Sequence, residues 1–159
     1  MGGMSAMNDN SQFTEYVTFI TGGQLFGLPI ARVQEVFRPG RITCVPLAGA
    51  QIAGVLNLRG RIVTAIDMRN CLGLKAGNGG GPAMAIGIES RGESFGLLVD
   101  SLGEVLKLAD GEREPNPVNL DRNLGRVAAG VYRLEGQLLV VLEVERVLDF
   151  AVDQIGAAA

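Results

Sequence analysis

Short runs of apolar and β-branched residues alternate along the chain with glycine-containing turns, and this pattern predicts many short β-strands. The runs that show it are YVTFI (16–20), GVLNL (54–58), RIVTAI (61–66), MAIGIE (84–89) and SFGLLV (94–99). GG (22–23), RG (59–60) and RGE (91–93) lie between successive runs, and such short glycine-containing links predict β-hairpins. The pattern therefore predicts a mainly β fold.

Two segments have the spacing of short helices instead. In ARVQEVF (31–37), Val33 falls on the same helical face as Val36 and Phe37. DMRNCLGL (67–74) begins with Asp67, a suitable helix N-cap, and Gly73 is placed to end the helix. A third segment, ITCVP (42–46), predicts a short strand that its proline closes.

The sequence contains an internal repeat. FGLPIARVQEV (26–36) aligns with FGLLVDSLGEV (95–105) at an offset of 69 residues. GVLNLRGRIVTAIDM (54–68) aligns with GVYRLEGQLLVVLEV (130–144) at an offset of 76 residues. The extra residues of the second half fall in the polar segment DGEREPNPVNLDRN (110–123). Each half therefore carries the same two blocks in the same order, which predicts two copies of one small β unit.

Five or so short strands in each half suit a small closed barrel, because closure removes exposed strand edges. We predict two such barrels packed side by side, the first at about residues 13–77 and the second at about 82–150. The glycine-rich segment AGNGGGPA (76–83) is predicted to be a flexible connector. Residues 1–12 are predicted to be a disordered tail, and residues 151–159 a frayed one.

Composition and charge disfavour most kinds of chemistry. The formal net charge of −3 lacks the basic excess of a nucleic-acid binder. The chain has no histidine, so it offers no Ser-His or Cys-His nucleophile pair, and we expect no metal or other cofactor. Cys44 and Cys71 are predicted to be buried free thiols in a reducing compartment. No apolar run is long enough for a membrane span, and we expect a cytoplasmic protein that does not insert into the membrane.

The two copies differ most at one turn, and this difference points to a docking site. The first copy has Asn57, Arg59 and Arg61 where the second has Arg133, Glu135 and Gln137. A cationic turn on an acidic protein suits an acidic patch of a partner. Residues shared by both copies, such as Glu35 and Glu104, are interpreted first as structural. Where two barrels meet, we also expect an apolar groove that could receive a helix of a partner.

Four motifs in this order resemble the CheW family of chemotaxis coupling proteins. They are E-V-x-R (35–38), V-P (45–46), G-V-x-N-L-R-G (54–60) and I-D-M-R (66–69), and the resemblance covers about residues 13–150. It implies two SH3-like five-stranded barrels and a non-catalytic adaptor. The implied partners are the regulatory domain of the histidine kinase CheA and the cytoplasmic tips of methyl-accepting chemoreceptors. The implied location is the cytoplasm, with recruitment to membrane-associated receptor arrays.

The same resemblance implies a set of partner-binding residues. Positions tied in the family to receptor coupling or kinase control match Val33, Glu35, Gly54 and Arg59 of this chain, while Val36, Asn57 and Leu58 lie beside them. Arg59 is the residue that we expect to matter most.

Two alternatives stay open. One is a small-molecule-binding β-barrel or minor enzyme with a site between the halves, although the sequence shows no convergent set of titratable residues for it. The other is a CheW-like paralogue that serves a signalling array outside chemotaxis, which the sequence does not distinguish from a chemotaxis protein.

Overall fold

The computed structural model describes residues 12–44, 52–74 and 84–158, with side chains described through residue 151. The strands are β1 (Phe13–Thr21), β2 (Gln24–Pro29), β3 (Val33–Phe37), β4 (Ile52–Leu58), β5 (Arg61–Asp67), β6 (Met84–Ser90), β7 (Glu93–Val99), β8 (Ser101–Ala109), β9 (Ala128–Leu134) and β10 (Gln137–Leu142). The helices are η1 (Ile30–Arg32), α2 (Met68–Leu72), η2 (Asp110–Glu112), α3 (Arg122–Val127) and α4 (Val144–Ala158).

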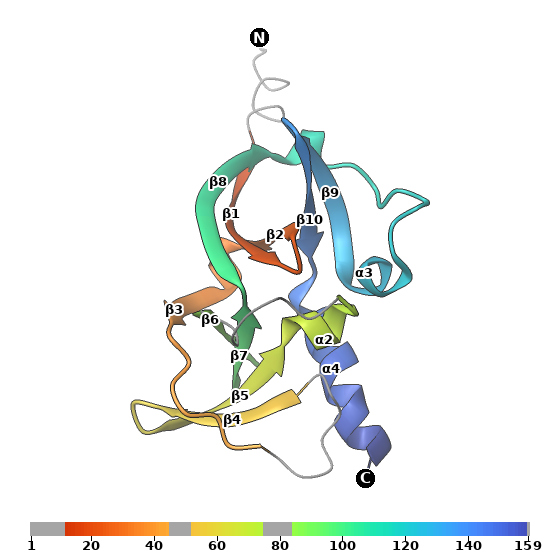
Figure 1. Ribbon diagram of the computed structural model, residues 1–159. Helices are drawn as coiled ribbons and strands as arrows, with labels where there is room; N and C mark the ends of the chain where they lie inside the picture. The colour runs from red at the N-terminus through yellow and green to blue at the C-terminus, as the bar shows by residue number, and fades with distance from the viewer. Residues whose placement is uncertain (1–11, 45–51, 75–83, 159) are drawn as a thin grey trace.

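The strands form two five-stranded sheets, and the predicted mainly β fold is confirmed. Sheet A has the order β3-β6-β7-β5-β4, and sheet B has the order β8-β1-β2-β10-β9. Figure 1 shows sheet B above sheet A, with α2, α3 and α4 along one side. Most neighbouring strands are antiparallel, whereas β5 with β7 and β10 with β2 are parallel pairs.

Each sheet takes strands from both halves of the chain, and this corrects the predicted barrel boundaries. Sheet A uses strands between residues 33 and 99, whereas sheet B combines β1 and β2 with β8, β9 and β10. The division at residues 77–82 therefore does not separate the two sheets. The physical reason lies in two short links, η1 between β2 and β3 and Asp100 between β7 and β8. Unlike the hairpin turns at Gly22–Gly23 and Arg59–Gly60, neither link contains a residue with positive φ that would reverse the chain, so the chain continues into the other sheet.

Each sheet is closed by one bridge between its two edge strands. Thr43, which follows β3, bridges Val55 of β4, and Glu114, which follows β8, bridges Val131 of β9. A glycine lies at each closure. A Cβ atom on Gly54 would lie 2.2 Å from the carbonyl oxygen of Thr43, and one on Gly130 would lie 2.8 Å from that of Glu114. Only glycine lets the closing segment approach so closely.

The largest apolar cluster lies where the two sheets face each other, and smaller clusters fill each sheet separately. Sheet B contributes Phe19 and Phe26 to the shared cluster, and sheet A contributes Ile86 and Leu97. Buried side chains of the three α-helices complete this cluster, and they are Met68, Cys71, Leu72, Leu124, Val127, Val144, Val147, Leu148 and Ala151. Because burial of a large apolar side chain contributes about 1.5–3 kcal/mol, this shared cluster holds the two sheets in one folding unit.

The predicted helix at residues 67–74 is confirmed together with its caps. Asp67 Oδ1 accepts a hydrogen bond from the backbone N–H of Asn70 at 3.2 Å, which is an N-cap contact. Gly73 ends the helix in the left-handed region with a φ of 70°. The predicted hairpins at Gly22–Gly23, Arg59–Gly60 and Arg91–Gly92 are also present.

Three local predictions differ from the structure. The segment 31–37 is not a helix, because only Ile30–Arg32 forms a 3₁₀ turn and β3 pairs with β6. Burial alternates along β3, but Glu35 lies on its half-buried face and Val36 on its exposed face, so the apolar spacing resembled that of a helix. Cys44 is exposed, whereas Cys71 is buried as predicted, and burial raises the pKa of the Cys71 thiol to about 12. The backbone of α4 is helical through Ala158, across most of the predicted frayed tail.

Several predictions fall on residues that the structure does not describe. They concern the N-terminal tail through residue 11, the V-P motif and the connector AGNGGGPA, so these stay predictions. Across the described ranges, no helix combines the length and apolar character needed to cross a membrane.

We expect Gly54→Ala to destabilise the fold by about 2 kcal/mol or more, because its Cβ atom would collide with the closing backbone at Thr43. Gly111→Ala is the matched control, since a Cβ atom there would meet nothing within 4 Å. Urea unfolding monitored by circular dichroism measures both variants. Equal unfolding free energies for the two would contradict the role of Gly54 in closing sheet A.

Candidate functional site

The turn between β4 and β5 is a two-residue hairpin with an arginine in an unusual conformation. Arg59 and Gly60 both have positive φ values, 52° and 83°, as a type I′ turn requires. The backbone N–H of Gly60 donates to Oδ1 of Asn57 at 2.9 Å. This hydrogen bond from the backbone to the Asn57 side chain stabilises the turn. An arginine in the left-handed region costs about 1–2 kcal/mol relative to glycine, and its side chain points into solvent.

Glu35 brings two arginines of this hairpin together. Its carboxylate forms a hydrogen-bonded ion pair with the guanidinium of Arg59, and Oε2 lies 3.6 Å from Nη2 of Arg61. The Arg59 side chain is 67% exposed and that of Glu35 is 26% exposed, so solvent screens the pair and it contributes at most about 1 kcal/mol. The pair mainly fixes the direction of the guanidinium. Glu35 thus pairs with arginines of its own chain, while its predicted part in partner binding stays a prediction.

The remaining predicted site residues take different positions. Val33 is half-buried and packs against the cluster between the sheets, and Leu58 packs against the interior of sheet A. Gly54 lies at the closing bridge, where it allows the close backbone approach. Val36 alone among the apolar members is an exposed large side chain. Because neighbouring residues of a strand point to opposite faces, Val36 and Glu35 face different sides of β3.

Two residues near the turn were not among the predicted site residues. Arg41 and Ile62 line a surface depression with Thr43, Val55, Leu56 and Asn57. Ile62 is 62% exposed, although it belongs to an apolar run that predicts a buried strand. Its pairing opposite the exposed Asn57 was the available signal, because paired residues share a face of the sheet. Beside the cationic turn, the structure therefore places an apolar side chain as well.

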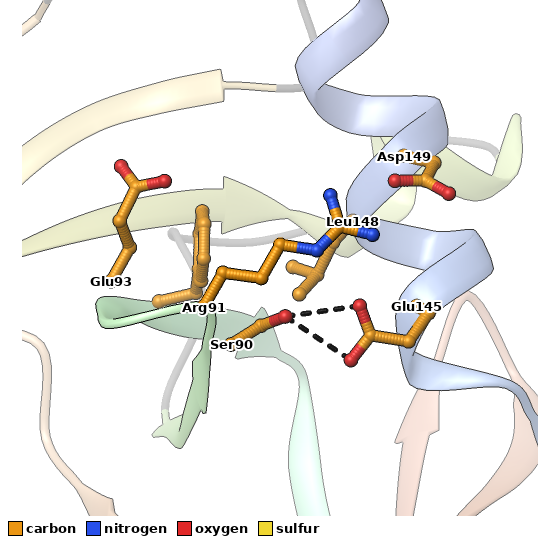
Figure 2. Close-up of a pocket in the computed structure, with 7 residues that line it drawn as sticks. Ser90, Arg91, Glu93, Glu145, Leu148 and Asp149 are labelled. Carbon is orange, nitrogen blue, oxygen red and sulfur yellow. Dashed lines mark hydrogen bonds between the residues drawn. The ribbon is translucent and has the colours of Figure 1, made fainter.

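A second, smaller pocket lies between the β6–β7 turn and α4, and Figure 2 shows its side chains. Ser90 Oγ lies 3.0 and 3.1 Å from the two carboxylate oxygens of Glu145 and donates its proton to that carboxylate. Arg32 donates to Oε2 of Glu145 at 2.7 Å. The hydrogen bonds from Arg32 and then Ser90 lower the pKa of Glu145, so this carboxylate stays ionised. The carboxylate of Glu145 is therefore already engaged by groups of the same chain.

The described residues contain no group of three or more Cys, Asp or Glu side chains that could hold a metal ion. The arrangement can therefore present a positioned guanidinium, a carboxylate and adjacent apolar surface. These groups suit recognition of a protein surface.

Comparisons with known proteins identify the family of this chain. The family model described as CheW-like domain matches residues 15–152. The Chemotaxis protein CheW of Helicobacter pylori is 27% identical over 144 residues, covering 91% of this chain and 87% of that protein. The Chemotaxis protein CheW of Rhizobium meliloti is 30% identical over 136 residues, covering 84% of this chain and 86% of that protein.

A solved structure gives the same result. The crystal structure of the scaffolding protein TtCheW from Thermoanaerobacter tengcongensis matches with a TM-score of 0.73 and 27% identity, over 82% of this chain and 89% of that one. The match to the family model extends over most of the sequence, including both sheets and the Arg59 turn. The chain belongs to the CheW-like domain family.

Proposed function

We propose that this chain is a non-catalytic adaptor that couples the cytoplasmic tips of methyl-accepting chemoreceptors to the histidine kinase CheA. The family supports a scaffold role, since the matched crystal structure is that of a scaffolding protein and the matched relatives are chemotaxis proteins. The observation that carries the proposal is the Arg59 turn, in which an exposed guanidinium is held in place by Glu35. An oriented guanidinium suits carboxylates and backbone carbonyls of a partner.

The proposed mechanism is the holding of two partners in a fixed geometry. Each contact is individually modest, and linkage of several contacts in one array raises the effective concentration of each partner. In this proposal the chain works in the cytoplasm and is recruited to membrane-associated receptor arrays by its partners. The apolar residues Val36 and Ile62 add exposed surface on the same sheet as Arg59.

The alternative of a small-molecule site or minor enzyme has less support. In the pocket beside α4, the carboxylate of Glu145 is engaged by Arg32 and Ser90. A thermal-shift screen with metabolites tests this alternative, because a ligand that binds only the folded state raises the unfolding temperature. The second alternative, a role in another signalling array, differs only in the identity of the partners. Binding assays with kinases and receptor tips from the same organism distinguish it.

We expect Arg59→Glu to weaken binding to the CheA regulatory domain or to a receptor tip by about 1–3 kcal/mol, the range of an interface anchor, while the fold stays intact. Isothermal titration calorimetry against each partner measures the loss. Arg91→Glu is the matched control, because Arg91 also precedes a glycine in a hairpin of sheet A and also has a positive φ, 54°. Unchanged affinity of folded Arg59→Glu for both partners would remove Arg59 from the interface.

A charge exchange separates the structural and the recognition roles of the ion pair. We expect Glu35→Arg combined with Arg59→Glu to unfold at nearly the same urea concentration as the parent chain, because the pair re-forms with reversed polarity and was worth at most about 1 kcal/mol. Affinity should stay low, because the partner would then meet a carboxylate. If the double variant binds as tightly as the parent chain, the ion pair as such is required and the cation is not.

A further inference from the structure

Two ion pairs connect the N-terminal half of the chain, which ends at residue 74, with the C-terminal half, which begins at residue 84. Both lie where the chain passes from one sheet to the other. In the first, Nη2 of Arg69 on α2 lies 2.8 Å from Oδ1 of Asp100, the residue between β7 and β8. Oδ2 of Asp100 also accepts the backbone N–H of Gly22 at 2.9 Å. Burial raises the pKa of Asp100, but the hydrogen bonds from Arg69 and Gly22 outweigh it and leave this pKa below its ordinary value. We call this contact clasp 1.

The second ion pair, clasp 2, lies at the other passage. Glu145 on α4 pairs with Arg32, the last residue of η1 between β2 and β3, at 2.7 Å. Its carboxylate is also bound by Ser90 at the end of β6, as Figure 2 shows. In both clasps a carboxylate therefore accepts a hydrogen bond from an arginine and a second one from the end of a hairpin strand or its turn.

The clasps lie at corresponding passages of the repeat but have opposite polarity, and the 69-residue offset aligns Asp100 with Ala31, the neighbour of Arg32. The 76-residue offset aligns Arg69 with Glu145, so the helix contributes a cation in clasp 1 and a carboxylate in clasp 2. As a consequence, the N-terminal half supplies both arginines, Arg32 and Arg69. The C-terminal half supplies both carboxylates, those of Asp100 and Glu145.

This distribution discriminates between possible pairings of the halves. If two N-terminal halves paired, Arg69 would take the place of Glu145 and meet Arg32. If two C-terminal halves paired, Glu145 would take the place of Arg69 and meet Asp100. The clasp side chains are only 23–38% exposed, so like charges placed there are less screened than on an open surface. The clasps therefore favour an N-terminal half with a C-terminal half.

The sheets impose the same requirement. Four strand pairs join the halves, namely β1 with β8, β2 with β10, β3 with β6, and β5 with β7. Neither sheet is made by one half alone. A C-terminal half supplied by a second molecule would re-form every one of these pairs. In the sequence, the halves are joined by residues 75–83, nine residues of which four are glycine, which span at most about 30 Å when extended.

We propose that this chain binds a second copy of itself by reciprocal exchange of halves, and that the two clasps restrict the exchange to an N-terminal half with a C-terminal half. The connector gives the halves of one molecule a high effective concentration, so the monomer is favoured when the chain is dilute. Exchange is favoured by refolding at high concentration. The exchanged dimer carries two Arg59 turns and extends the proposed adaptor to a bivalent one.

Two full-length variants test the exchange directly. The first carries Arg32→Glu and Arg69→Glu, and the second carries Asp100→Arg and Glu145→Arg. Each variant alone has like charges in both clasps. Exchange of halves between the two variants restores opposite charges in all the clasps of the dimer. One of its two folded units then contains the original Arg32, Arg69, Asp100 and Glu145. The variants, with different affinity tags, are unfolded in urea and refolded separately or as an equimolar mixture.

We expect the mixture to give a heterodimer, measured by size-exclusion chromatography with light scattering and by capture through both tags. Its yield should exceed that of dimer from either variant alone by roughly tenfold or more. Its unfolding temperature should also exceed that of each separate variant. Refolding two differently tagged batches of the first variant together is the control, and it should give no such dimer.

Two results would overturn the proposal. One is a mixture that yields no heterodimer, whether the separate variants fold or not, because opposite charges would then fail to direct the halves. The other is a pair of variants that each fold as monomers with the unfolding temperature of the parent chain, because like charges in the clasps would then be tolerated. The parent chain supplies an independent readout, since its dimer fraction should rise with protein concentration during refolding.

Discussion

The short links at the two passages between the sheets are the constraint from which the rest of the structure follows. Neither η1 nor Asp100 contains a residue with positive φ, so neither reverses the chain as the hairpin turns do, and the strand that ends there continues into the other sheet. Each sheet therefore needs two hairpin strands from one half and three strands from the other. The β1–β2 and β6–β7 hairpins then meet between the sheets, where Phe19 and Phe26 pack in one cluster with Ile86 and Leu97. The shared core therefore contains side chains of hairpins from both halves of the chain.

The candidate site depends on the closure of sheet A. The chain that leaves β3 returns at Thr43 to bridge Val55, and this places β3 beside the β4–β5 hairpin at the far edge of the sheet order. Glu35 on β3 thereby reaches Arg59 on the hairpin. Gly54 permits the bridge, so it influences the ion pair without touching it. This accounts physically for a glycine among the predicted site residues.

Elements determined by local chemistry could be predicted from the sequence, whereas their pairing could not. Turn residues such as Gly22 and Gly60 and the caps Asp67 and Gly73 act within a few residues, and the corresponding hairpins and helix are present. The repeat offsets are the same whether each hairpin joins the sheet of its own half or that of the other half, so they carry no information about strand partners. The 31–37 segment was misread because β3 carries a charged residue, Glu35, on its half-buried face and an apolar residue, Val36, on its exposed face. The exposure of Ile62 follows from its place opposite Asn57 in the hairpin, a signal that the apolar run alone does not carry.

Strain at Arg59 does not by itself mark a functional site. Arg91 has almost the same positive φ in the β6–β7 turn, so this conformation is a property of the two-residue hairpins of sheet A. Among the described residues, Glu135, which the repeat aligns with Arg59, does not have a positive φ. The repeat therefore does not require a positive φ at this position. What distinguishes Arg59 from Arg91 is the carboxylate of Glu35, which directs its guanidinium. In the second copy the repeat aligns Glu104 with Glu35 and Glu135 with Arg59, and the structure records no ion pair for Glu104 among the described residues. The two copies of this duplicated scaffold therefore differ in charge at one turn, and the proposed function rests on that difference.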